Sequence, residues 1–281
     1  MTGTSGPGRV ETAVSVTALA KLTLSLSVTG VRDDGLHLLD AEMVSIDLAD
    51  TLTFGPGTGI SMVDDGPGQL GTGRVPIGPD NLVARALAIV GRSAAVHIVK
   101  RIPVGAGLGG GSADAAAVLR WAGVTDLSVA ARLGADVPFC VRGGRARVTG
   151  IGEAVEPLAF EARQFVLLLP PLSVDTGAVY ERWDSRLARL GTDHKGDRSG
   201  SNDLELAAIE VAPALADWRD LLAEASNQRP RLAGSGSTWF VEGDREELGL
   251  AGRDFLVMEG GRAPLVPVRT VPATSGHDTR S

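Results

Sequence analysis

The sequence predicts a mixed α/β protein of the α+β type, built from two packed domains. The chain has 281 residues, more than one small hydrophobic core usually serves, since domains commonly hold ~100–200 residues. Strand-like alternation followed by helical periodicity fills its first half, and a continuous apolar run at residues 165–169 starts a new pattern. A hydrophobic fraction of 43% with 22% charged residues is typical of a chain that folds.

Two long strands are expected near the start of the chain. Apolar and polar side chains alternate over residues 13–28, which is the period of a strand with one buried face. The turn sequence 32–35 interrupts this pattern, and residues 41–54 resume an extended, apolar character. The Gly- and Pro-rich segment 55–73 indicates turns between strands.

A helix, a strand, a glycine loop and a second helix follow. Asp80 or Asn81 can cap a helix whose apolar residues recur every three or four positions. Residues 95–102 are predicted to form a strand, residues 103–111 a glycine loop, and residues 112–121 an alanine-rich helix. This strand, loop and helix are the unit on which the functional interpretation depends.

The second domain is expected to begin near residues 151–160, which divides the chain into domains 13–155 and 156–272. Its pattern predicts helices covering one face of a sheet. The helices are expected at 178–190 and 203–225, and the strands at 165–169, 231–233, 238–241, 255–259 and 265–271. Residues 191–200 are expected to form a polar loop, and 1–12 and 273–281 to be disordered.

Composition excludes several function classes. The net charge of -7, from 27 Lys+Arg against 34 Asp+Glu, disfavours nucleic acid and anionic membranes as partners. No apolar stretch approaches the ~20 residues of a membrane helix. Cys140 is the single cysteine, so a disulfide framework and a cysteine-rich zinc site are excluded, and the first residues lack a signal-peptide pattern. We expect a cytoplasmic monomer or homodimer acting on a small molecule.

The glycine loop is predicted to hold an anion. Five of the seven residues from 105 to 111 are glycines, so backbone N–H groups can approach a ligand closely. The loop leads directly into a helix, whose first turn offers free N–H donors and the positive end of the helix dipole. We therefore favour nucleotide phosphate binding over a flexible turn.

Two familiar nucleotide loops fit poorly. Gly105, Gly107 and Gly110 satisfy G-x-G-x-x-G, but a dinucleotide-binding fold also needs an acidic residue about 20 positions later, at the end of a second parallel strand. Asp126 lies instead in a turn before the helix-like segment 127–133. No lysine follows the glycines, so the Walker A pattern fails. The loop therefore indicates a kinase of another type.

Residues 103–117 closely resemble the ATP loop of the GHMP small-molecule kinases. Further segments resemble that family in the family's order, and together they cover most of the chain: 20–22, 32–37, 80–86, 134–139, 149–153, 202–205 and 233–237. The resemblance implies the GHMP kinase fold, with a ribosomal-S5-like N-terminal domain, a ferredoxin-like α+β C-terminal domain and the active site between them. It also implies ATP and Mg²⁺ as cofactors.

The resemblance implies which residues bind the nucleotide. They are Pro103, Val104, Gly105, Ala106, Gly107, Leu108, Gly109, Gly110, Gly111, Ser112 and Ala113. From the residues alone, Ser112 can cap the helix, contact phosphate or approach Mg²⁺, and capping is the simplest of the three roles. Asp114 fits a first-turn carboxylate favoured by the helix dipole. The scattered histidines at 97, 194 and 277 show no metal-ligand spacing, so we assign solvated or packing roles to them and no zinc site.

Lys21 and Asp136 are the candidate catalytic residues. A lysine in a strand is ordinarily a surface residue, although Lys21 is one of only three lysines in the chain, and Asp136 before Val137 and Pro138 also fits a turn. The resemblance implies that Asp136 is the general base for phosphoryl transfer and Lys21 its charged partner.

The acceptor site is where the chain departs from the family pattern. In finer detail the motifs resemble the branch that phosphorylates the 2-hydroxyl of a cytidine-diphosphate-linked methylerythritol in the non-mevalonate isoprenoid pathway. That branch has Asn and Tyr where this chain has Thr23 and Leu36, while His37 and Tyr180 fit the expected cytosine pocket. A kinase for another small alcohol, an ATP-binding protein without catalysis and, more distantly, a dinucleotide oxidoreductase remain as alternatives.

Overall fold

The computed structural model describes four stretches of the chain, residues 13–67, 78–190, 202–259 and 261–273. The expected loop at 191–200 and the expected disorder at 1–12 and beyond residue 273 lie outside these stretches, as does the end of the segment 55–73.

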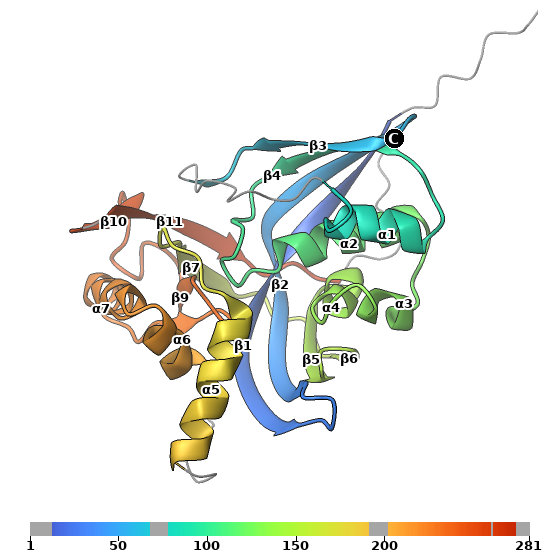
Figure 1. Ribbon diagram of the computed structural model, residues 1–281. Helices are drawn as coiled ribbons and strands as arrows, with labels where there is room; N and C mark the ends of the chain where they lie inside the picture. Colours follow the sequence, from blue (N-terminus) through green and yellow to red (C-terminus); the bar gives the residue numbers. More distant parts are fainter. Residues whose placement is uncertain (1–12, 68–77, 191–201, 260, 274–281) are drawn as a thin grey trace, which may run out of the picture.

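A long antiparallel strand pair runs through the first half of the molecule (Figure 1). β1 (Val14–Val31) pairs with β2 (His37–Gly55) along its length, with Val14 opposite Phe54 and Val31 opposite His37. Alternate side chains of β1 are buried, as the alternation predicts. From residue 20 to residue 24 every side chain is buried, because the glycine loop and the second half of the chain cover the other face.

The two strands belong to a sheet with helices packed against it. Its order is β3-β4-β2-β5-β6, and β1 pairs with β2 beside this path. The remaining strands are β3 (Gly59–Asp64), β4 (Ala95–Lys100), β5 (Arg145–Gly150) and β6 (Ala154–Pro157). The helices are α1 (Leu82–Ile89), α2 (Gly110–Trp121), α3 (Leu127–Ala131) and α4 (Val137–Arg142).

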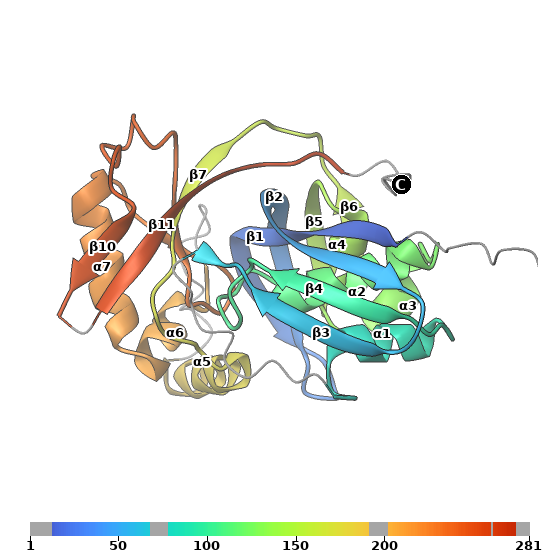
Figure 2. The ribbon, with the colours of Figure 1, turned by 90° about the horizontal axis from the view of Figure 1, so that it is seen from above.

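The second half forms an antiparallel sheet of order β10-β11-β7-β9-β8 with its own helices. Figure 2 shows this unit beside the first one. Its strands are β7 (Gln164–Leu168), β8 (Arg231–Leu232), β9 (Trp239–Glu242), β10 (Phe255–Met258) and β11 (Gly261–Arg269). Its helices are α5 (Thr176–Leu190), α6 (Glu205–Val211) and α7 (Ala214–Ser226).

Three expectations about elements were wrong. The segment 55–73 was expected to contain only turns, but it holds β3, which pairs in parallel with β4. The single helix expected at 203–225 is two helices, because Pro213 lacks an N–H and disfavours a helical conformation for Ala212, whose φ and ψ are −134° and 84°. The alanine-rich helix α2 begins at Gly110 rather than at residue 112.

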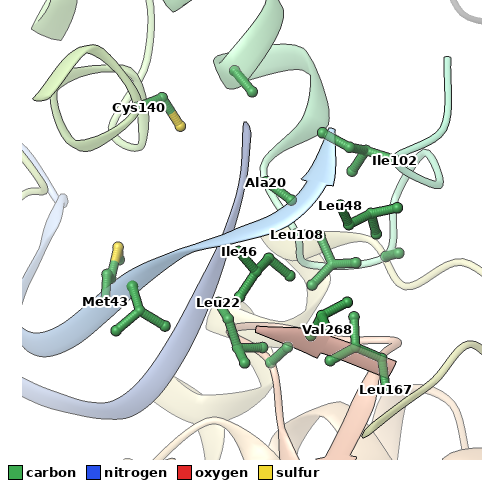
Figure 3. Packing of buried hydrophobic residues seen from close by; sticks show 14 of the residues in the cluster. Ala20, Leu22, Met43, Ile46, Leu48, Ile102, Leu108, Cys140, Leu167 and Val268 are labelled. Atoms are coloured by element: carbon green, nitrogen blue, oxygen red, sulfur yellow. The ribbon is translucent and has the colours of Figure 1, made fainter. Parts of the chain in front are cut away.

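One hydrophobic core extends through both halves of the molecule. Figure 3 shows Leu22 and Ile46 from the first sheet gathered with Leu167 and Val268 from the second. An isolated bridge between Ile46 and Thr270 also joins the two sheets. The first sheet ends with β6 and the second begins with β7, and we keep the division into two domains in this region as a proposal.

Candidate active site

A cavity of about 500 Å³ is bordered by the glycine loop, β1, the start of α4, helix α5 and the loop at 234–235. All predicted loop residues except Leu108 and Ala113 line it. Those two side chains are buried in the core, with exposed fractions of 0% and 1%. The loop thus anchors itself with apolar side chains while its glycines face the cavity.

The glycines at 107 and 109 are required by their surroundings. Both have positive φ, 76° and 70°, which other residues adopt only with strain. A Cβ on Gly107 would lie 2.2 Å from the carbonyl oxygen of Ala233, and one on Gly109 would lie 2.9 Å from Cγ of Lys21. Close packing therefore fixes the path of the loop between β1 and the second half.

The start of α2 differs from the expectation for Ser112. The N-cap residue is Gly109, in the left-handed conformation, and no side chain caps the helix. Ser112 lies in the first turn and lines the cavity, so the expected capping role was wrong. The first N–H groups of α2 have no intrahelical acceptor, which leaves them as donors beside the cavity.

Lys21 and Asp136 meet at the cavity, although 115 positions separate them in the sequence. Nζ of Lys21 lies 3.5 Å from Oδ2 of Asp136 and donates a hydrogen bond to Oγ1 of Thr23 at 3.1 Å. Lys21 is 5% exposed, whereas about a third (32%) of the Asp136 side chain is accessible. Asp136 stands at the N-cap of α4 without capping it, so its carboxylate is available to a ligand.

A backbone irregularity places Lys21 against the glycine loop. The pairing of β1 with β2 shifts register between Leu19 and Lys21, and such bulges leave backbone groups outside the ladder. The N–H of Lys21 donates to the carbonyl oxygen of Leu108 at 3.1 Å instead. A backbone hydrogen bond thus connects Lys21, a candidate catalytic residue, directly to the glycine loop.

A buried charged triad lies beneath the loop, and it was not predicted. Nζ of Lys100 donates to Asp50 and, at 2.8 Å, to Oδ2 of Asp114. Asp50 also accepts the N–H groups of Arg101 and Ile102 at 2.6 and 2.9 Å. Asp114 is therefore a buried partner of Lys100 and not the first-turn carboxylate that was expected. The scarcity of lysine was the one signal in the sequence that singled out Lys100.

The burial of Asp114 has a consequence for stability. Loss of solvation raises the pKa of Asp114 from 3.8 to about 7, with Lys100 opposing this change and Asp50 adding to it. Its Oδ1 has no hydrogen-bond partner among the described residues. A carboxyl group whose pKa is higher in the folded state holds its proton more tightly there, so folding loses stability as the pH rises through this window.

We predict that the free energy of unfolding of the wild type, relative to Asp114→Asn, falls as the pH rises from about 4 to about 7. Asparagine cannot titrate, so the difference isolates the Asp114 proton from other groups. Urea unfolding at four pH values across this range measures it. Parallel curves for the two proteins would contradict the raised pKa.

Three of the four acceptor-site candidates, Thr23, His37 and Tyr180, are linked by contacts to Lys21 or to one another, and no such contact places Leu36 with them. Tyr180 lines the cavity, and burial together with the charge of Asp136 raises the pKa of its phenol to about 12. The His37 ring stacks on Tyr180, with centroids 4.6 Å apart. Leu36 is 46% exposed and, like His37 and Thr23, is not among the lining residues.

The loop at 234–237 is held over the cavity by hydrogen bonds. Nδ2 of Asn202 donates to the carbonyl oxygens of Leu232 and Gly234 at 3.0 and 2.5 Å. The hydroxyls of Ser235 and Thr176 lie 2.8 Å apart, which ties the loop to the start of α5. A Cβ on Gly234 would lie 3.2 Å from Nζ of Lys21, so this loop closes over the lysine.

The described residues show neither a metal-ligand cluster nor a membrane-spanning helix. They contain no group of three or more His, Cys, Asp or Glu side chains placed to hold a metal ion. Nδ1 of His97 is 3.0 Å from Oγ of Ser61, while His194 and His277 lie outside the described stretches. No helix in the described part of the chain is long and apolar enough to cross a membrane.

Comparison with known proteins places the chain among kinases. Residues 81–144 match the GHMP kinases N terminal domain. The 4-diphosphocytidyl-2-C-methyl-D-erythritol kinase of Paracoccus denitrificans is 40% identical over 239 residues, covering 79% of this chain and 84% of that protein. The protein of the same name from Cereibacter sphaeroides is 35% identical over 282 residues, covering 90% and 98%.

Solved structures agree with this relationship. A crystal structure of 4-(cytidine 5'-diphospho)-2C-methyl-D-erythritol kinase matches with a TM-score of 0.65 and 32% identity, covering 92% of this chain and 99% of that one. A mevalonate kinase shares the fold at 12% identity, with a TM-score of 0.56. The GHMP kinase fold expected from the sequence is confirmed.

Proposed function

The chain belongs to the 4-diphosphocytidyl-2-C-methyl-D-erythritol kinases of the GHMP kinase family, and from this we propose which of its residues carry the reaction. It is an ATP-dependent phosphotransferase that phosphorylates 4-diphosphocytidyl-2-C-methyl-D-erythritol in isoprenoid biosynthesis. We propose the 2-hydroxyl as the acceptor. The observation that carries the proposal is the Lys21–Asp136 pair, which stands between the glycine loop and Tyr180.

The glycine loop and the start of α2 bind the phosphates of ATP. Gly105, Gly107 and Gly109 keep side chains out of this surface, and the free N–H groups of the first helical turn donate to phosphate oxygens. Mg²⁺ enters with ATP as part of that substrate, since kinases hold it largely through phosphate oxygens and one or two carboxylates.

Asp136 acts as the general base. Its carboxylate removes the proton of the acceptor hydroxyl while the hydroxyl oxygen bonds to the γ-phosphorus. The bond from phosphorus to the bridging oxygen of ADP breaks, and ADP leaves. The ammonium of Lys21, 3.5 Å from Oδ2 of Asp136, keeps positive charge beside the reacting oxygens, and its hydrogen bond to Thr23 fixes its position.

A panel of acceptors tests this function. ADP formation with the cytidyl substrate should exceed that with homoserine, mevalonate and simple sugar alcohols, because only the cytidyl substrate engages both Asp136 and Tyr180. A higher kcat/KM for one of the small alcohols would contradict the assignment. ATP binding without turnover on any acceptor would indicate a protein that has lost catalysis.

Tyr180 is proposed to provide an aromatic face for the cytosine. We predict that Tyr180→Ala costs ~1–3 kcal/mol of stacking, seen chiefly as a higher KM for the acceptor. Tyr180→Phe keeps the ring and should recover most of this loss. Leu36→Tyr should lower the same KM, since residue 36 is 46% exposed and has room for a ring. An acceptor KM that is the same in the wild type and in all these variants would contradict the binding of cytosine beside Tyr180.

A further inference from the structure

One face of helix α5 surrounds His37. Tyr180, Trp183 and Asp184 stand three and four positions apart on α5, and such residues lie next to one another on a helix surface. Tyr180 faces the cavity, whereas the other two extend this face beyond it. His37 comes from the start of β2, which follows the turn at 32–35.

All three residues fix the imidazole of His37. Its Nε2 lies 2.8 Å from Oδ1 of Asp184. The ring stacks on Tyr180 at 4.6 Å with an interplanar angle of 28°, and the edge contact with Trp183 has a centroid distance of 5.6 Å. The His37 side chain is 13% exposed. The hydrogen bond to Asp184 and the two ring contacts thus fix both the position and the orientation of the imidazole.

The carboxylate of Asp184 also selects the tautomer. An ionised carboxylate only accepts hydrogen bonds, so in the neutral ring the proton must be on Nε2, which leaves Nδ1 as an acceptor. Nδ1 has no hydrogen-bond partner within the described stretches. His37 does not itself line the cavity, but its ring stacks on Tyr180, which does, so a ligand bound beside Tyr180 can supply the donor.

We propose that Asp184 is a positioning residue that determines base specificity, by holding His37 as a hydrogen-bond acceptor for an amino group of the base. This inference rests on the proposed function. Cytosine carries an amine at its 4-position, where uracil carries a carbonyl. Because the other end of the acceptor must reach Asp136, the base cannot turn freely to offer a different edge. A carbonyl facing the Nδ1 lone pair leaves both groups without a partner, which disfavours the uridyl analogue.

The test compares the cytidyl acceptor with its uridyl analogue at pH 8, in the wild type, Asp184→Asn and Glu181→Gln. An asparagine can accept from or donate to Nε2, so both tautomers become available. We expect Asp184→Asn to raise the KM of the cytidyl acceptor about 3- to 10-fold and to lower the ratio of cytidyl to uridyl kcat/KM by a similar factor. The kcat should change less than about twofold. Glu181 is an exposed carboxylate on the same helix, and Glu181→Gln should leave both values unchanged.

Nitrogen-15 NMR of the imidazoles gives a readout that does not depend on turnover. The chain has four histidines, and the His37→Gln variant identifies the signals of His37. We expect only the Nε2–H tautomer in the wild type and a mixture in Asp184→Asn. An Nδ1–H tautomer in the wild type, or an unchanged selectivity ratio in Asp184→Asn, would overturn the role of Asp184. Absence of turnover with both acceptors would instead overturn the proposed function, and the base selectivity with it.

Discussion

Replacing Asp136 with asparagine is expected to lower kcat by ~10²–10⁴-fold, because an amide cannot take the proton of the acceptor hydroxyl. The dissociation constant of ATP should change little. We propose that backbone N–H groups of the glycine loop and of the first turn of α2 bind the phosphates, and the substitution leaves all of these donors in place. Pre-steady-state phosphoryl transfer and ATP titration measure the two quantities separately.

Asp126→Asn provides a matched control, since Asp126 is also an aspartate at the start of a short helix. Its carboxylate accepts the N–H of Ser128 at 2.8 Å, and it is not among the residues that line the cavity. This variant should lose some stability and keep the wild-type kcat. Turnover at the wild-type rate in Asp136→Asn would remove Asp136 from the mechanism.

Lys100→Met is expected to lower the free energy of unfolding by about 3–5 kcal/mol, the cost of leaving a buried charge without its partner. Asp50 and Asp114 are 0% and 4% exposed, and Lys100 is 3% exposed, so water cannot replace the ammonium. Adding Asp50→Asn to Lys100→Met should recover part of the loss, because the buried carboxylate that lost its ammonium partner is then replaced by a neutral amide.

The neighbouring cation is the control for this measurement. Arg101 pairs with Asp65 at the surface, where 43% and 59% of the two side chains are exposed. Arg101→Met should therefore cost far less than Lys100→Met. Equal urea midpoints for these two variants would show that the triad does not stabilise the fold.

The sequence predicted elements well where one local pattern decides the conformation. Alternation identified β1, and clustered glycines followed by alanines identified the loop and α2. Prediction was poorer where two signals compete. In β3 the turn residues around Gly59 obscured a strand only six residues long. In α2 the left-handed Gly109 starts the helix before Ser112 can cap it.

The site residues that sequence reasoning missed are held together by contacts between positions far apart in the chain. Asp50 and Asp114 lie 50 and 14 positions from Lys100, a spacing that no local motif records. The pairing of His37 with Asp184 spans 147 positions and depends on how α5 packs against the start of β2. Lys21 was identified through its motif, but its burial follows only from the contact of β1 with the glycine loop and the second half.

The hydroxyl that receives the phosphate distinguishes this reaction from every alternative. Purified protein is incubated with ATP, Mg²⁺ and 4-diphosphocytidyl-2-C-methyl-D-erythritol labelled with carbon-13 at C2, and the product is examined by carbon and phosphorus NMR. We expect one new phosphate monoester whose phosphorus couples to the labelled C2, formed in equal amount to ADP, and formed ~10²–10⁴-fold more slowly with Asp136→Asn. A phosphate on another hydroxyl, or ADP formation without a phosphorylated acceptor, would contradict this expectation.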